Sequence, residues 1–220
     1  MIEVLYEDNH LIAVNKKSGD IVQGDKTGDT PLSDFVKEYI KKKYNKPGEV
    51  FLGTIHRLDR PTSGIILYAR TSKALSRMNK QFRDKEVQKT YLAVVDNPPS
   101  NNSGTLENYL QKNQKQNKSY VTKNKDGKHA VLDYKLLKKL DNFYLMEIKP
   151  QTGRHHQIRV QLANIGCVIK GDLKYGSKRS NKDASIHLLA HKLEFTHPVK
   201  KENITIIAPS PKDSLWDACK

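Results

Sequence analysis

The chain has 220 residues, of which 36% are hydrophobic, and it carries a formal net charge of +15. No apolar run approaches the roughly 18 residues that a membrane-spanning helix needs, and the first residues are acidic where a secretory leader would be basic. We therefore expect neither a membrane-spanning helix nor a secretory leader, and we expect one catalytic-size domain over residues 1–220.

The excess of positive charge predicts an acidic polymer as the partner. Lysine and arginine side chains that neutralise phosphates release condensed counterions, which gives affinity without sequence specificity. Binding to a membrane surface is the competing interpretation, but no basic amphipathic helix with an aromatic apolar face is evident. Cys167 and Cys219 lie far apart and lack metal-ligand spacing, which is typical of a reducing cytoplasm, although a disulfide between them remains an alternative.

The N-terminal part predicts a hairpin and then a helix. Residues 2–6 and 10–15 form two short strand patterns around a turn-prone tripeptide. Thr30 is expected to cap a helix that has Pro31 in its first position. The lysine-rich residues 41–48 that follow are either a frayed helix end or a loop that contacts the polymer.

A segment with proline and glycine precedes an apolar strand. Pro61 biases Arg60 away from the α region, and Gly64 permits a positive φ. We therefore expect Asp59 on a turn that leads into a strand at residues 65–69. Turns presented by a rigid sheet commonly carry binding and catalytic side chains.

The middle of the chain predicts a helix, a strand and a basic insertion. Ser72 is expected to cap a helix that runs to about Asp84, and residues 89–95 form a strand pattern. Residues 97–128 are expected to form a basic loop or β-excursion, because positions 111–128 hold six lysines and one aspartate. This insertion either contacts a polymer backbone or is merely solvated.

The C-terminal half predicts strands and one further helix, from about residue 155 to 165, that Gly166 ends. Strands outnumber helices and often follow one another directly. We therefore expect an α+β fold with a mixed, largely antiparallel central sheet flanked by helices and loops. The expected strands lie at residues 130–139, 143–149, 186–195 and 204–208.

Asp59 is the first candidate for chemistry, because it lies between Arg57 and Arg60. One interpretation is an ion pair that fixes the turn. The other is a nucleophile or base that neighbouring cations keep ionised, since nearby positive charge lowers the pKa of a carboxyl group.

A second group of candidates lies at the start of the expected helix. His155 and Arg159 are one helical turn apart and should share a face. The group is either a phosphate-binding helix N-terminus or a source of a cation that reaches Asp59. It comprises Arg154, His155, His156, Gln157 and Arg159.

Tyr91 and three histidines complete the candidates. Tyr91 is either a core residue or a ring that stacks on a base, because aromatic stacking is worth about 1–3 kcal/mol per base. A strand would place His187, His191 and His197 on one face, but no cysteine or acidic cluster completes a metal site. We therefore expect no metal.

Five ordered segments resemble the RluA-type pseudouridine synthase family. The resemblance implies a pseudouridine synthase-like catalytic domain, an isomerase that converts specific uridines of ribosomal or transfer RNA to pseudouridine. It implies no cofactor and no metal. The segments are residues 6–16, 56–64, 82–91, 152–159 and 171–176.

The resemblance also implies roles for individual residues. Asp59 is the catalytic aspartate, which either attacks the sugar or removes the C2′ proton; Tyr91 packs on the target base, and Arg159 forms a salt bridge with the aspartate. Arg57 enters the RNA as the uridine flips out of the stack, a step that costs a few kcal/mol. Further RNA contacts are expected from Arg60, Arg154, His156 and Gln157.

Two departures from the family pattern stand out. Many relatives carry an N-terminal RNA-binding module of the S4 type, whereas this chain reaches the catalytic motif within its first residues, so target choice is expected to rest on the loops of this domain. Gln161 occupies a position where relatives often have histidine. We expect a monomer.

A function from another class is a noncatalytic RNA-binding or ribosome-assembly factor that kept the fold. The basic surface alone does not separate it from an enzyme. The joint presence of Asp59, Tyr91 and Arg159 argues for the enzyme.

Overall fold

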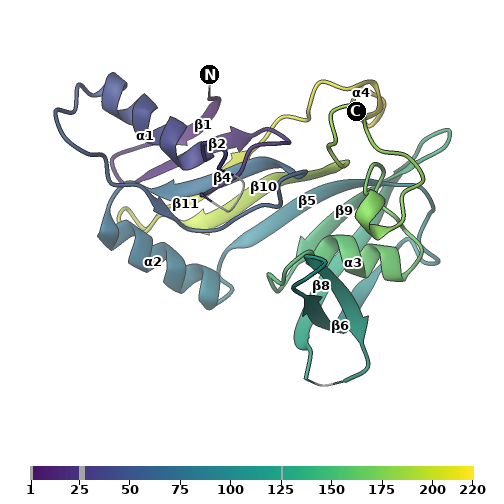
Figure 1. The fold of residues 1–220 in the computed structure, drawn as a ribbon. Coiled ribbons are helices and arrows are strands. Elements are labelled where there is room, and N and C mark those ends of the chain that lie inside the picture. The colour runs from purple at the N-terminus through teal and green to yellow at the C-terminus, as the bar shows by residue number, and fades with distance from the viewer. Residues whose placement is uncertain (1, 25–27, 125) are drawn as a thin grey trace. The chain divides into compact units, whose positions relative to one another are not determined.

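The computed structural model describes residues 2–24, 28–124 and 126–220. They divide into two compact units, Met1–Gln88 with Ala190–Pro209 and Lys89–Leu189 with Ser210–Lys220. Both units combine sheet strands with helices, which confirms the predicted α+β class (Figure 1). No helix in the described ranges is long and apolar enough to cross a membrane. A single domain over residues 1–220 stays a prediction.

The first unit is built on a sheet whose interior strand is β4. This strand is buried along its whole length, which explains its unbroken apolar run. It pairs antiparallel with β2 and β3 and lies next to β10, while β2 also pairs with β1 and β10 with β11. The strands are β1 (Val4–Glu7), β2 (Leu11–Lys16), β3 (Gly53–Thr54), β4 (Ser63–Ala69), β10 (Leu188–Thr196) from Ala190 onward, and β11 (Asn203–Ile207).

Helix α1 (Leu32–Lys43) packs on this sheet through residues at helical spacing. Its buried Leu32, Val36 and Ile40 share one hydrophobic cluster with Ile66 and Tyr68 of β4. The predicted cap was wrong by one residue: Pro31 is the N-cap, with no side-chain hydrogen bond, so Pro31 is not the first helical residue and Thr30 lies outside.

The N-cap of helix α2 (Ser72–Arg83) lies one residue before the predicted cap. The Thr71 hydroxyl accepts a hydrogen bond from the Ala74 amide, so Thr71 and not Ser72 is the N-cap. Either hydroxyl suits the position, and the extended backbone of Thr71 decides between them.

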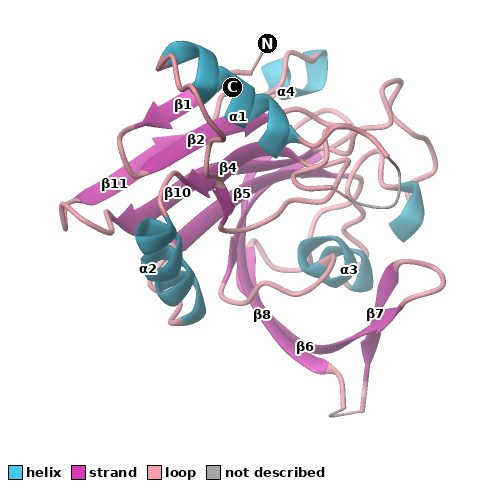
Figure 2. Cartoon of the chain, turned by 60° about the vertical axis from the view of Figure 1, so that its left-hand side comes forward, coloured by secondary structure: helices cyan, strands magenta, loops and turns pink. Residues whose placement is uncertain are grey.

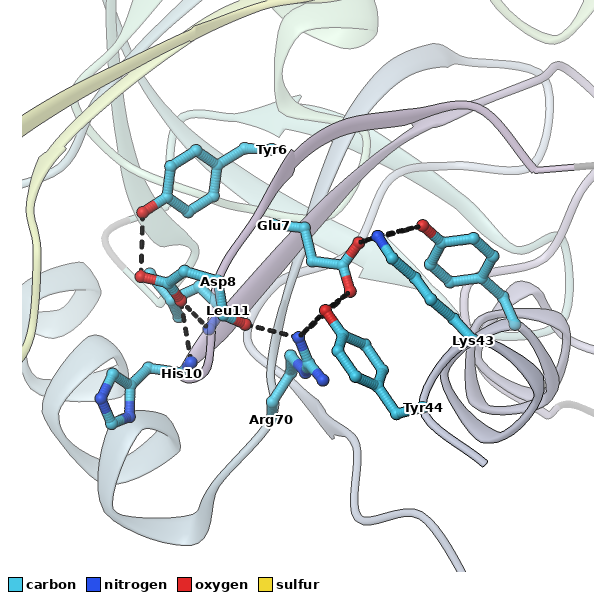
Figure 3. Close-up of polar contacts among 9 residues, drawn as sticks. Tyr6, Glu7, Asp8, His10, Leu11, Lys43, Tyr44 and Arg70 are labelled. Atoms are coloured by element: carbon cyan, nitrogen blue, oxygen red, sulfur yellow. Dashed lines mark hydrogen bonds and ion pairs between the residues drawn. The ribbon is translucent and has the colours of Figure 1, made fainter. Parts of the chain in front are cut away.

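A carboxylate in the β1–β2 turn region connects this sheet to α1. The nearly buried Glu7 carboxylate accepts hydrogen bonds from Lys43 at 2.7 Å, from Tyr44 at 2.9 Å and from Arg70 at 3.1 Å (Figure 3). Tyr39 adds another at 3.0 Å. Burial raises the pKa of Glu7, but the hydrogen bonds from Lys43 and the tyrosines together lower it by more than burial raises it. The net shift of the Glu7 pKa is therefore downward.

The second unit contains a sheet of five antiparallel strands. They run in the order β5 (Gln88–Val95), β9 (Tyr144–Pro150), β8 (Lys128–Lys139), β6 (Ser103–Asn113) and β7 (Lys118–Thr122). Most of the polar insertion is thus a β-excursion: β6 and β7 extend the sheet, and loops precede Ser103 and connect the strands. Lys125, inside this insertion, lies outside the described residues.

Helix α3 (Gln157–Asn164) covers the inner face of this sheet (Figure 2). The prediction of a start at residue 155 was wrong, because His156 adopts a left-handed conformation with φ 54° and caps the helix. His155 therefore precedes the helix and does not share a helical face with Arg159. Three short elements were not predicted, because none is long enough to show a periodic pattern. They are the strand β3, the 3₁₀ helix η1 (Leu173–Tyr175) and the helix α4 (Ser214–Ala218).

Candidate active site

Asp59 lies where the sequence predicts, at the first position of a turn before β4. The Thr62 amide donates a hydrogen bond of 3.0 Å to the Asp59 carbonyl, which closes the turn over Arg60 and Pro61. The strand begins at Ser63, directly after the turn. The Asp59 side chain is half-buried and belongs to the first unit.

A buried lysine donates hydrogen bonds to the backbone of this turn. Lys16 has no exposed surface, and its Nζ donates hydrogen bonds to the carbonyls of Thr62 at 2.7 Å, Arg60 at 3.0 Å and Lys17 at 3.0 Å. An ammonium group has three donors, so all of them are matched by acceptors. The pairing of Lys16 with Gly64 across β2 and β4 places this side chain beside the turn.

Burial lowers the pKa of Lys16 to about 8, although the Asp20 and Asp59 carboxylates act in the opposite direction. The side chain is therefore still charged at neutral pH. Its positive charge lies beside the turn that carries Asp59.

Gly64 and His56 fix the two ends of the segment. Gly64 has a φ of +115°, and a Cβ there would lie 2.3 Å from the Ala190 carbonyl oxygen of β10, so no other residue fits. His56 accepts a hydrogen bond of 3.1 Å from the Leu67 amide and stacks on Phe82 of α2 at 5.2 Å. The Asp59 turn is thus supported on both sides by sheet and helix.

The side chains of the two arginines beside Asp59 have different environments. Arg57 is exposed. Arg60 forms an ion pair of 2.8 Å with Asp29, in which both side chains are about half exposed. An exposed pair of this kind contributes little to stability, so Arg60 can exchange Asp29 for another anion at small cost.

Arg159 lies in the second unit and is held in place by a carboxylate. Its Nε and Nη2 donate to the two oxygens of Asp172 at 2.7 and 2.8 Å, and both side chains are buried. The guanidinium also lies 5.1 Å from the centre of the Tyr175 ring. This bidentate contact fixes the plane of the arginine.

The other candidates before α3 organise the loop that carries Arg154. The Gln157 side chain accepts hydrogen bonds from the Thr152 hydroxyl at 2.8 Å and the Arg154 amide at 3.0 Å, and donates to the Val131 carbonyl at 3.0 Å. Arg154 is exposed, and its Nε donates to the His129 carbonyl at 2.8 Å. Gln157 is buried, so its evident role is to shape the loop.

His156 is also buried, and a ring nitrogen lies 2.9 Å from the Tyr175 hydroxyl. Burial and the neighbouring Arg159 charge lower the pKa of His156 to about 2, so the ring is neutral. The Tyr175 hydroxyl accepts from the Ser119 amide at 2.9 Å, which connects α3 to β7. Direct RNA contacts of His156 and Gln157 stay predictions.

Tyr91 lies in β5 opposite Ile148 of β9. Its ring is half-buried and packs against the cluster that contains Ala93, Met146 and Ile158. Tyr91 is therefore partly packed and partly exposed. The ion pair predicted between Asp59 and Arg159 stays a prediction, because each residue is described within its own unit.

Sequence reasoning missed the two residues that position the candidates. Lys16 is the last residue of β2, a strand whose first four residues are apolar and buried. A lysine at the end of such an apolar strand is the sequence signal that could have identified it. Asp172 belongs to the Gly-Asp segment that marks the family, but the sequence did not assign it a partner.

The three histidines proposed as a strand face have separate partners. His187 Nε2 lies 3.3 Å from Asp213, His191 Nδ1 lies 3.0 Å from the Ala208 carbonyl, and His197 Nε2 lies 2.8 Å from Asp8. Only His191 lies within β10. Over the described ranges, no three His, Cys, Asp or Glu residues are grouped to hold a metal ion.

The family model of RNA pseudouridylate synthase matches residues 10–164, which include the Asp59 turn, Tyr91 and Arg159. The chain belongs to this family. Its members are isomerases, which agrees with the predicted class of enzyme.

Curated relatives of the family are similar over most of the chain. A protein of Buchnera aphidicola (subspecies Schizaphis graminum) named ribosomal large subunit pseudouridine synthase C is 36% identical over 214 residues, which cover 94% of this chain and 66% of that protein. A Vibrio vulnificus protein of the same name is 35% identical over 94% of this chain and 65% of its own length. The chain thus spans about two thirds of the length of these relatives.

A solved structure supports the fold. The human protein named RNA pseudouridylate synthase domain containing 4 superposes with a TM-score of 0.80 and 23% sequence identity, over 96% of this chain and 89% of that one.

The Lys16 contacts predict a local effect of Lys16→Met. Loss of hydrogen bonds from a charged donor, worth about 1.5–3 kcal/mol each, should raise amide exchange at Thr62 and Gly19 by about 10-fold or more. The change in global unfolding free energy should be smaller, because the desolvation cost of the ammonium is lost as well. Exchange monitored by NMR measures the effect.

Lys17→Met, at the exposed neighbour, is the matched control and should leave both amides unchanged. Equal exchange in the Lys16 and Lys17 variants would contradict the role given to Lys16.

Proposed function

We propose that this chain is an RNA pseudouridine synthase that isomerises specific uridines of ribosomal RNA. Family membership and the names of the relatives support this proposal. Those names give no specific support to transfer RNA, the other substrate that the sequence left open. The observation that carries the proposal is a carboxylate on a turn that a buried ammonium group and a glycine-only contact hold rigid.

In the proposed reaction, the N1–C1′ bond of the target uridine breaks and a C5–C1′ bond forms. The C5 proton leaves to solvent and N1 gains a proton, so the product is an isomer of the substrate. Asp59 either attacks C1′ or removes the C2′ proton, and each route needs the carboxylate ionised. Lys16 holds the turn that carries this carboxylate through its hydrogen bonds to the Arg60 and Thr62 carbonyls. No cofactor takes part in these steps.

The second unit supplies the other proposed catalytic groups. Arg159 balances the charge of Asp59, and Asp172 positions Arg159 through the bidentate contact. Tyr91 packs on the target base with the exposed part of its ring. His156 and Gln157, which are buried, shape the loop before α3.

The exposed arginines are proposed to contact RNA. Arg57 enters the stack that the uridine leaves, because base flipping is needed to expose a glycosidic bond. Arg60 and Arg154 contact phosphates. We further propose that the protein acts in the cytoplasm as a monomer, where ribosomal RNA of the kind named for its relatives is present.

A noncatalytic RNA-binding role is the second candidate. The basic charge of +15 favours it as much as it favours an enzyme. The elaborate support of Asp59 is not needed to bind RNA, so the enzyme is the better account.

Asp59→Asn tests the proposal. The amide cannot act as nucleophile or base, so release of tritium from RNA labelled at uracil C5 should fall by about 10³-fold or more. Asp141→Asn, which makes the same charge change at an exposed site, should leave the release unchanged. Retained release in the Asp59 variant would remove this residue from the reaction.

Asp172→Asn tests the positioning of Arg159. The amide cannot supply two charged acceptors, so kcat should fall by about 10-fold or more while KM for the RNA changes by less than about 2-fold. Asp172→Glu, which restores the charge, should recover part of kcat. A parallel loss of thermal stability and of RNA affinity, with no separate effect on kcat, would reduce Asp172 to a purely structural residue.

A further inference from the structure

The outer face of the β6–β7–β8 sheet is unusual for a surface exposed to solvent. Strand alternation divides this sheet into two faces. The inner face packs on α3, because Leu110 and Ala130 share a hydrophobic cluster with Val160 of that helix. The outer face lies on the side away from α3 (Figure 2).

Aromatic rings occupy the outer face on all three strands. Tyr109 of β6 pairs with His129 of β8, and their ring centres are 5.6 Å apart. Tyr120 of β7 pairs with Gln111, the next outward residue of β6, so it is a diagonal neighbour of Tyr109. Tyr120 is 41% exposed, Tyr109 is half-buried and His129 is exposed. We call these three residues the aromatic platform.

Cations lie close to the platform. Lys118 Nζ lies 5.2 Å from the centre of the Tyr120 ring and 5.1 Å from that of the Tyr175 ring, and the exposed Lys123 directly follows β7. Arg154 donates to the His129 carbonyl, so its exposed guanidinium lies at the edge of the platform. An acid also lies on this face: Glu107 contacts the His129 ring at 2.7 Å.

This combination of groups fits one class of ligand. Strands that face solvent normally carry polar residues outward, so aromatic rings on three neighbouring strands are unusual there. Exposed rings on a sheet bind unpaired bases by stacking, and interleaved lysines neutralise the phosphates between them.

We propose that the aromatic platform binds unpaired nucleotides of the RNA, with bases stacked on Tyr120 and Tyr109. The proposal rests on the proposed function only in that RNA is the polymer. Arg154 connects the platform to the segment before α3, so nucleotides on the platform flank those held by that segment. Duplex RNA does not fit this site, because its bases are already stacked and paired.

Binding of an oligoadenylate of about 12 nucleotides to the full chain tests the proposal. This RNA has no uridine, so catalysis plays no part. Fluorescence anisotropy should give a Kd that Tyr120→Leu raises by about 10-fold, since a stacked base is worth about 1–3 kcal/mol. The slope of log Kd against log salt concentration should stay unchanged, because the substitution removes no phosphate contact.

Two further variants and a duplex serve as controls. Tyr120→Trp keeps a ring and should bind oligoadenylate at least as tightly as the unmodified chain. Phe35→Leu, at a residue of α1 that is 48% exposed, should leave the Kd unchanged. Binding of a duplex of the same length should not depend on Tyr120.

Several outcomes overturn the proposal. One is an unchanged oligoadenylate Kd in Tyr120→Leu, and another is an equal loss of affinity for oligoadenylate and duplex. Weakened binding in Tyr120→Trp is a third. The proposal is separable from the enzymatic function: a chain that releases no tritium from uracil C5 but shows the expected Tyr120 dependence would refute the isomerase and leave the platform standing.

Discussion

The buried ammonium group of Lys16 is the constraint on which the proposed site depends. Its three hydrogen bonds reach carbonyls on both sides of Pro61, so the turn that begins at Asp59 cannot move without leaving a charge unsatisfied. Lowering its pKa from 10.5 to about 8 means that the charged form costs on the order of 3 kcal/mol. The fold tolerates this cost because the three hydrogen bonds of the ammonium group fix the turn that carries Asp59.

The second unit also fixes a buried cation, but with a carboxylate in place of carbonyl groups. There a buried arginine, Arg159, is fixed by the Asp172 carboxylate, and Tyr175 packs beside its guanidinium. A buried charge that has lost its partner costs several kcal/mol, so each pair allows only a narrow range of geometry. Side chains held in this way lose little freedom when a substrate arrives, which is the property that a site for base isomerisation requires.

The sequence predicted the class of fold and the place of Asp59, but not what supports that residue. Proline and glycine report backbone preferences locally, so the Asp59 turn was predictable, as were the strands of the β8–β9 pair. Contacts across the sheet, such as Lys16 with the Thr62 carbonyl, depend on register and are invisible to local patterns. The predicted starts of α2 and α3 were wrong for a related reason. At Thr71 and His156 the backbone conformation, and not the residue type, decides where the helix begins.

Pseudouridine mapping of ribosomal RNA tests the central claim most directly, in cells that encode this chain and in cells that lack its gene. The account predicts that at least one pseudouridine disappears without the gene, and that it returns when the unmodified chain is supplied but not when the Asp59→Asn variant is supplied. An RNA in which every pseudouridine survives loss of the gene, or in which the Asp59→Asn variant restores the missing site, would contradict the account.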